Sequence, residues 1–229
     1  MKTEPRIGIS GDFDRELPGL IDPYCEDIFG AYGFHYEFFH EPFSSELTPS
    51  TIDNYDGILT YHYRFGRDAL IECKRLCVIS RWGVGYDTVD ISACTQAGIL
   101  VTIVSRETVR RSVAEGILAF IFAITKDLRT KDQLVRKGSW QTKAANPSRM
   151  LQSLTLGSIG VGNIGRELFK LSRSLGFQRF LGTDPYIDQQ DVSALGVNLV
   201  DLRTLLAESD IVSINCPLTP ETRNLISSE

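Results

Sequence analysis

Residues 156–166 read Leu-Gly-Ser-Ile-Gly-Val-Gly-Asn-Ile-Gly-Arg. Gly160, Gly162 and Gly165 form the pattern Gly-x-Gly-x-x-Gly, which supplies a tight turn, a close backbone approach to a pyrophosphate, and close packing of a helix on its strand. Residues 154–159 have the apolar character of a buried strand, and a helical pattern opens after Gly165. The sequence therefore predicts a strand, turn and helix that bind a dinucleotide, with an ordinary glycine turn as the competing interpretation.

An acidic residue follows the next predicted strand, 179–183. Asp184 lies nineteen positions beyond Gly165, where a carboxylate can accept hydrogen bonds from the adenosine ribose hydroxyls. A 2′-phosphate would be repelled there, and the next residues are Pro185 and Tyr186 rather than an arginine. We expect NAD, rather than NADP, as the cofactor.

The composition limits the other classes of function. The chain has 229 residues, 42% of them hydrophobic and 23% charged, and a net charge of -5. This length is enough for two hydrophobic cores of modest size. The net negative charge opposes binding to the phosphate backbone of nucleic acids. The longest apolar run, 117–124, is too short to cross a membrane. Five cysteines form no metal-binding spacing with the three histidines, so we expect no metal, free thiols and a cytoplasmic location.

Strand and helix patterns alternate along residues 6–104. We expect helical segments over 16–31, where Pro18 and Pro23 limit where the helix can start, and over 67–75. We expect strands over 6–10, 34–39, 57–61, 76–80 and 99–104. This alternation is typical of a parallel, doubly wound α/β sheet.

A long apolar helix is predicted over Thr108–Leu128. Its segment 113–123 is apolar on nearly every side, so we expect it to be buried on several sides, between domains or in a homodimer. The polar segment 126–148 should be an exposed excursion.

Four blocks in the order found here resemble the NAD-dependent D-2-hydroxyacid dehydrogenase family. They are Arg81-Trp82-Gly83-Val84-Gly85-Tyr86-Asp87-Thr88-Val89-Asp90, Ser112-Val113-Ala114-Glu115, Gly160 to Gly165 with Asp184, and Asn215-Cys216-Pro217-Leu218-Thr219-Pro220-Glu221-Thr222. The resemblance implies hydride transfer between NAD(H) and a small 2-keto or D-2-hydroxy acid. It also implies a flavodoxin-like substrate domain, 1–104, and a Rossmann-type NAD-binding domain, 105–229.

The same resemblance assigns roles to individual residues. Val84 and Gly85 would offer backbone N–H groups to the substrate carboxylate, as a Gly-x-Gly turn can do. Tyr61 and Arg64, near a strand end, are possible substrate contacts or merely parts of a solvated loop. The cofactor residues would be Gly160, Gly162, Asn163, Ile164, Gly165, Asp184, Cys216, Pro217 and Thr222.

Two departures from the family pattern affect these expectations. Residues 105–111 replace the family's Gly-x-Asn stretch, and the family's catalytic Arg, Glu and His would lie beyond Glu229. Of the histidines present, only His62 is near a strand end, and we favour a surface or packing role for it over that of a catalytic acid. We therefore expect both domains to be incomplete at the C-terminal side and these 229 residues to bind NADH without turnover. A non-catalytic, dinucleotide-binding regulatory or interaction protein is the alternative, and a gene remnant is a further one.

Overall fold

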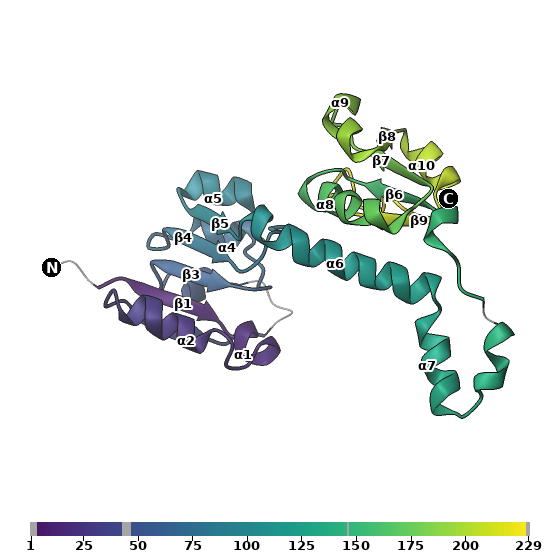
Figure 1. The fold of residues 1–229 in the computed structure, drawn as a ribbon. Helices are drawn as coiled ribbons and strands as arrows, with labels where there is room; N and C mark the ends of the chain where they lie inside the picture. The colour runs from purple at the N-terminus through teal and green to yellow at the C-terminus, as the bar shows by residue number, and fades with distance from the viewer. Residues whose placement is uncertain (1–3, 43–46, 146, 228–229) are drawn as a thin grey trace. The chain divides into compact units, whose positions relative to one another are not determined.

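A computed structural model describes residues 4–42, 47–145 and 147–227. They form two compact units, Met1–Ser105 and Arg106–Glu229. Each unit has its own parallel sheet (Figure 1). Each unit also has its own buried hydrophobic residues.

The first unit is built on a parallel sheet with the strand order β2-β1-β3-β4-β5. Its strands are β1 (Arg6–Ser10), β2 (His35–Phe39), β3 (Gly57–Thr60), β4 (Val78–Arg81) and β5 (Leu100–Ile103). This order is the flavodoxin-like one. The predicted doubly wound parallel sheet is therefore confirmed.

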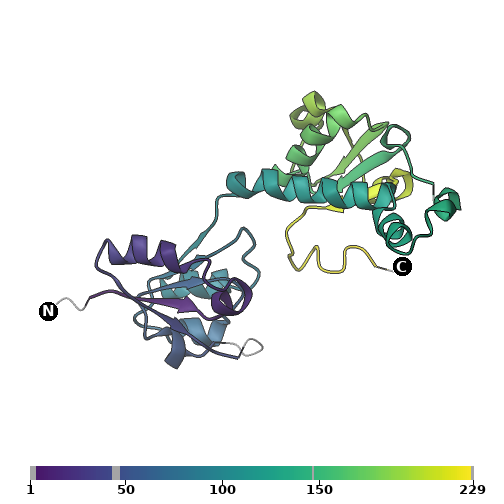
Figure 2. The same cartoon turned by 60° about the horizontal axis from the view of Figure 1, so that its bottom comes forward.

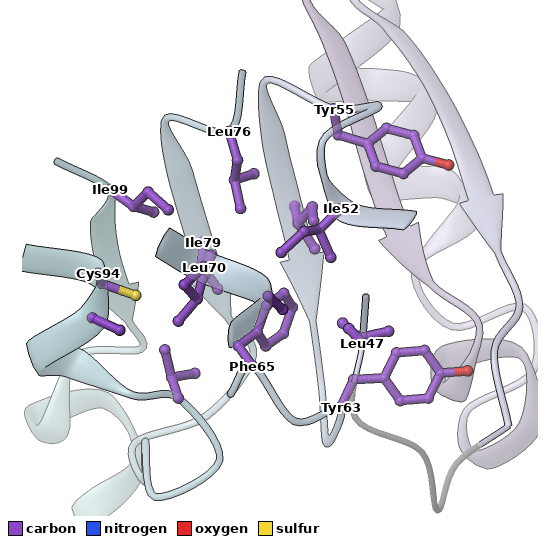
Figure 3. Close-up of a cluster of buried hydrophobic side chains, with 14 of the residues drawn as sticks. Leu47, Ile52, Tyr55, Tyr63, Phe65, Leu70, Leu76, Ile79, Cys94 and Ile99 are labelled. Atoms are coloured by element: carbon purple, nitrogen blue, oxygen red, sulfur yellow. The ribbon is translucent and has the colours of Figure 1, made fainter. Parts of the chain in front are cut away.

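Helices cover both faces of this sheet because alternate side chains of each buried strand point to opposite sides. Leu59 of β3 packs with Ile9 on the face covered by α1 (Asp12–Glu16) and α2 (Asp22–Cys25). Ile58 packs on the other face, with residues of α3 (Pro49–Ile52), α4 (Arg67–Ile71) and α5 (Ile91–Ala97). Figure 3 shows Phe65, Leu70 and Ile79 grouped in this second core.

The helical pattern predicted over 16–31 forms short separate segments rather than one helix. Helix α1 ends at Glu16, and helical structure resumes only with α2 and a following π-helical turn, Glu26–Gly30. Pro23 lies in the first turn of α2, where a proline costs no intrahelical hydrogen bond. A helix also forms over Ile91–Ala97, where none was predicted. The Asp90 side chain accepts a hydrogen bond from the Ala93 amide, and Gly98 ends the helix in the left-handed conformation.

The second unit has the strand order β8-β7-β6-β9. This corresponds to the order 3-2-1-4 of the Rossmann fold, that is, the three strands of the first half and the first strand of the second half. Its strands are β6 (Thr155–Ile159), β7 (Arg179–Thr183), β8 (Val197–Leu199) and β9 (Ile211–Ile214). The helices are α6 (Arg106–Thr125), α7 (Leu128–Arg136), α8 (Asn163–Ser172), α9 (Gln189–Val192) and α10 (Leu202–Glu208). Short 3-10 turns occupy Trp140–Ala145, Leu151–Ser153, Arg173–Leu175 and Ser193–Leu195.

Strand β6 lies in the middle of this unit, and all of its residues are buried. Leu156 packs with Leu168 and Phe169 of α8 on one face, together with residues of α6. Ile159 packs with Leu205 of α10 on the other face. The predicted buried strand before the glycine turn is therefore confirmed.

Helix α6 is one continuous helix (Figures 1 and 2), and within the second unit it is not buried on several sides. Ala114, Ile121 and Thr125 are its buried residues, whereas Phe120 is 73% exposed and Ile124 is 75% exposed. One stripe of the helix packs against α8 and the other side faces away from it. The helix also ends earlier than predicted, because Asp127 takes a left-handed conformation (φ 50°) and Leu128 begins α7.

Among the helices that the structure describes, none has both the length and the apolar composition needed to cross a membrane.

A carboxylate just before a strand fixes the start of a neighbouring strand in both units. Asp56, before β3, accepts a hydrogen bond from the Arg6 amide at 2.7 Å and pairs with Arg75. Asp210, before β9, accepts from the Thr155 amide at 2.9 Å and pairs with Arg149. The Thr155 amide, followed by the Arg149 guanidinium, lowers the pKa of Asp210 below its usual range. These bonds fix the register of β1 with β3 and of β6 with β9.

We expect Asp210→Ala to lower the free energy of unfolding at pH 7 by about 1 kcal/mol, because a strand amide loses its charged acceptor. The folded-state pKa is depressed, so the contribution is present above the unfolded pKa of about 4 and disappears as pH falls through the folded value. Urea unfolding at several pH values should therefore show wild type and variant converging in acid.

The control for this measurement is Asp210→Asn, which keeps an acceptor for the Thr155 amide but cannot ionise. It should lose less free energy of unfolding than Asp210→Ala. If the loss in Asp210→Ala stays constant from pH 7 to strong acid, the ionised Asp210 carboxylate is not what stabilises this strand.

Candidate dinucleotide site at the end of strand β6

The turn between β6 and α8 is shaped by two glycines that have no room for a side chain. Gly160 has φ +88°, and a Cβ there would lie 2.7 Å from the Cys216 nitrogen. A Cβ on Gly165 would lie 2.5 Å from the Gly160 carbonyl oxygen. These distances are shorter than non-bonded atoms tolerate, so the turn, the following helix and the loop after β9 approach one another only because both residues are glycine.

Gly162 differs from its two neighbours, because a Cβ added there would meet no atom within 4 Å. The residue lies directly before α8 and caps its start. The first amides of a helix lack intrahelical partners and attract an anion. The space beside Gly162 is open, and it lies next to the first residues of α8, Asn163 and Ile164, for which diphosphate contacts were predicted.

Asp184 lies beside this turn, as predicted, but its carboxylate also holds the turn itself. One oxygen accepts a hydrogen bond from the Val161 amide at 2.9 Å, and the other accepts from the Tyr186 amide at 3.0 Å. A carboxylate oxygen has more than one acceptor direction. The predicted contact with a ribose is thus compatible with these bonds.

The loop after β9 brings the remaining predicted cofactor residues to the same edge of the sheet. The Cys216 backbone lies against Gly160. The Thr222 hydroxyl donates to the Pro217 carbonyl at 2.6 Å and accepts from the Thr219 amide at 2.8 Å. These bonds close the loop on itself.

The predicted substrate residues lie in the first unit, at the ends of two adjacent strands. Tyr61 follows β3, while Val84 and Gly85 follow β4, and the Trp82 amide donates to the Thr60 carbonyl at 2.8 Å. Arg64 is exposed and lines a pocket of about 180 Å³ with Asp87 and Thr88. The structure thus relates Tyr61 to the glycine turn by strand pairing, and it places Arg64 beside residues that follow this turn in the chain.

His62 has a carboxylate partner that the sequence analysis missed. Its Nδ1 lies 3.0 Å from Glu16 Oε2. A hydrogen bond from Arg15, with a smaller contribution from the charge of His62, lowers the pKa of Glu16. Their separation in the sequence hides this pair, which becomes visible only once α1 and the end of β3 are placed together.

All five cysteines are free thiols. Burial raises the pKa of Cys73 and of Cys94 to about 11, so these two thiols are poor nucleophiles at neutral pH. Across the described parts of the chain, no group of three or more His, Cys, Asp or Glu side chains could hold a metal ion.

The order of the strands, the glycine turn and the open space beside Gly162 define the second unit as a dinucleotide-binding unit of the Rossmann type. Comparison with known proteins gives the family. The catalytic domain of D-isomer specific 2-hydroxyacid dehydrogenases matches residues 17–170. The NAD binding domain of the same enzymes matches residues 118–229. The chain belongs to this family, and its second unit carries the family's NAD-binding fold.

Individual relatives agree with the family match. The chain is 32% identical to a D-3-phosphoglycerate dehydrogenase of Synechocystis sp. over 179 residues, 78% of this chain and 32% of that protein. It is 35% identical to a hydroxypyruvate reductase of Thermotoga maritima over 156 residues, 68% of this chain and 49% of that protein. The chain thus spans about a third of the length of the D-3-phosphoglycerate dehydrogenases that it matches.

Among solved structures, the chain resembles a D-lactate dehydrogenase from Aquifex aeolicus complexed with NAD and lactic acid. The TM-score is 0.81 at 25% identity, and the match covers 94% of this chain and 62% of that one.

The three glycines should respond differently to a single added methyl group. Gly160→Ala and Gly165→Ala should each lower the free energy of unfolding by about 2 kcal/mol or more, since each forces backbone atoms apart. Gly162→Ala should leave stability within about 1 kcal/mol of wild type and weaken NADH binding at least about tenfold. Urea unfolding and NADH fluorescence titration measure the two effects.

Gly196→Ala serves as a control for strain alone, because Gly196 has φ +73° but open space around its Cβ position. Wild-type NADH affinity in folded Gly162→Ala would contradict the placement of the diphosphate.

Proposed function

We propose that this chain provides the cofactor site and part of the substrate site of an NAD-dependent oxidoreductase that transfers hydride between NAD(H) and a 2-keto or D-2-hydroxy acid. One observation carries the proposal: Gly160 and Gly165 are closed to any side chain, whereas the space beside Gly162 is open at the start of α8. This is the arrangement that a dinucleotide diphosphate requires. In this proposal residues 1–104 form the substrate domain and residues 105–229 form the NAD-binding domain.

The proposed cofactor contacts follow from position. Amides of Gly162, Asn163 and Ile164 face the diphosphate, and Asp184 accepts hydrogen bonds from the adenosine ribose. The loop from Cys216 through Pro217 to Thr222 lines the remaining part of the dinucleotide. When bound, the nicotinamide supplies the hydride.

The proposed substrate contacts are backbone amides at Val84 and Gly85, which bind the carboxylate shared by all 2-keto acids. Tyr61 and Arg64 contact the remainder of the substrate. Support comes from the position of Tyr61 and the glycine turn at the carboxyl ends of β3 and β4, the edge where doubly wound sheets bind ligands.

We expect NADH to bind at least about tenfold more tightly than NADPH, because the Asp184 carboxylate repels a 2′-phosphate. Fluorescence titration with both cofactors measures the ratio. The Asp184→Ala variant should reduce this ratio of affinities. It should also bind NADH more weakly than wild type, because it loses the acceptor for the Val161 amide. Tighter binding of NADPH by wild type would contradict the cofactor assignment.

The reaction class is tested on the longest natural protein that contains these residues. Oxidation of NADH is followed with pyruvate, glyoxylate, hydroxypyruvate and 2-ketoglutarate as substrates. Turnover that depends on one of these keto acids supports the proposal. Tight NADH binding with no turnover on any of them would favour the regulatory alternative.

We further propose that the helix predicted over 108–128 forms the interface of a homodimer. The exposed apolar side chains on α6 and at the start of α7 support this: Val113, Phe120, Ile124 and Leu128. Exposed apolar stripes of this kind are typical of subunit interfaces.

Replacing Phe120 with Asp should convert the dimer to a monomer, because an unpaired charge would be buried in the interface. Sedimentation velocity or light scattering gives the mass in solution. Tyr186→Asp is the matched control, since Tyr186 is also exposed in the second unit but lies away from α6. A wild-type monomer, or a Phe120→Asp dimer of unchanged stability, would contradict the interface.

The cytoplasm is the proposed location. Five unpaired cysteines support it, because thiols stay reduced in that compartment.

A further inference from the structure

Ser158 is an unexpected residue at its position. It lies in β6, the central and fully buried strand of the second unit, and is itself completely buried. A hydroxyl group in such a place is unfavourable unless it has hydrogen-bond partners. The contacts of this hydroxyl therefore indicate why a serine is there.

The Ser158 hydroxyl joins two segments that come from distant parts of the sequence. It donates a hydrogen bond to the Gly160 carbonyl at 2.8 Å, and it accepts one from Asn215 Nδ2, also at 2.8 Å. The Ser213 hydroxyl donates to Asn215 Oδ1 at 3.2 Å, which orients the amide. The result is a hydrogen-bonded chain from the end of β9 to the first glycine of the turn.

Other groups hold the rest of the turn. The Gly160 amide donates to the Thr183 carbonyl, and the Val161 amide donates to Asp184. The Val161 carbonyl accepts from Arg166 Nε at 3.0 Å. The Ser158 hydroxyl thus holds the one remaining polar backbone group of residues 160–161, the Gly160 carbonyl, against which Gly165 also packs.

We propose that Ser158 and Asn215 are positioning residues that couple the loop beginning at Cys216 to the glycine turn, and so hold that turn in the shape that a pyrophosphate requires. Neither residue touches the cofactor in this role. Besides the backbone contacts of Gly160 with Cys216 and of Ile159 with Asn215, the loop after β9 is thus linked to the phosphate site through one side-chain amide and one hydroxyl. The proposal rests on the proposed function, because its ligand is a dinucleotide.

The test compares ligands with and without a pyrophosphate. Dissociation constants for NADH, ADP-ribose and adenosine are measured with Ser158→Ala, Asn215→Ala, the double variant and Asn215→Asp. Asn215→Asp keeps the size of the side chain and the acceptor for Ser213 but cannot donate to Ser158.

Two matched controls accompany these variants. Ser172→Ala removes a buried hydroxyl of α8 that has no hydrogen-bond partner among the described residues. Asn198→Ala removes an exposed amide from the edge strand β8.

Each single variant should bind NADH and ADP-ribose about tenfold more weakly, because each breaks the hydrogen-bonded chain that holds the Gly160 carbonyl. Adenosine affinity should change by less than about twofold, since adenosine has no phosphate to position. The double variant should bind NADH and ADP-ribose no more than about tenfold more weakly than wild type, because both substitutions break the same chain of hydrogen bonds. Both controls should bind like wild type.

A second measurement does not depend on a ligand. Hydrogen exchange of the Val161 amide should accelerate in Ser158→Ala and Asn215→Ala, with the Gly182 amide of β7 as the internal reference. Three results would each overturn the proposal. They are exchange of the Val161 amide at the wild-type rate in the variants, equal losses of affinity for adenosine and ADP-ribose, and additive losses of affinity in the double variant. If wild type binds neither NADH nor ADP-ribose, the proposed function fails, and exchange at Val161 alone then decides whether the coupling exists.

Discussion

The close approach of two backbones, at Gly160 and Cys216, is the constraint on which the second unit depends. The pairing of Ile159 with Ile214 brings the ends of β6 and β9 together, and the Asn215 amide continues this pairing by donating to the Ile159 carbonyl at 2.7 Å. Helix α8 then rests on the Gly160 carbonyl at Gly165. The turn, the neighbouring strand end and the helix are therefore fixed together, and none can be changed without moving the other two.

Both units place a serine at the point where the order of strands reverses. In the second unit this is Ser158, between β6 and β9. In the first unit it is Ser10, at the end of β1, whose hydroxyl donates to Asp12 and accepts from the Tyr61 amide beyond β3. Doubly wound sheets bind ligands at such points. Here the same positions hold loops together, so the shape of each binding edge depends on buried polar side chains as well as on glycines.

The sequence predicted the strands well, because buried parallel strands are short apolar runs bounded by turn residues. It also located the glycine turn and Asp184. It did not predict the hydrogen bond from the Val161 amide to Asp184, the pairing of His62 with Glu16, or the bond between Ser158 and Asn215, since each depends on tertiary contacts between distant segments. The roles assigned to individual site residues remain predictions. One signal for Ser158 was available, namely a hydroxyl in an otherwise apolar central strand.

The differences between the predicted and observed helices have physical causes. A pattern that is apolar on every side predicts burial, and within the second unit one stripe of α6 packs on α8; burial of its other sides between domains or in a homodimer stays a prediction. The helical pattern over 16–31 is divided where the prolines limit it, with Pro18 between α1 and α2 and Pro23 in the first turn of α2. Helix α5 was missed although Asp90 and Gly98 mark its two ends, because its short length carries little periodicity.

The strand order has a consequence for synthesis on the ribosome. Leu156 pairs with Phe180 on one side and with Ile211 on the other, so the nascent chain can join β6 to β7 well before β9 emerges. Until then the newly made β6 has an open edge, and the glycine turn lacks the backbone that closes it. Such edges invite pairing with other chains. Assembly of the phosphate site thus waits for β9, and during the interval before β9 emerges the open edge of β6 exposes the chain to misassociation.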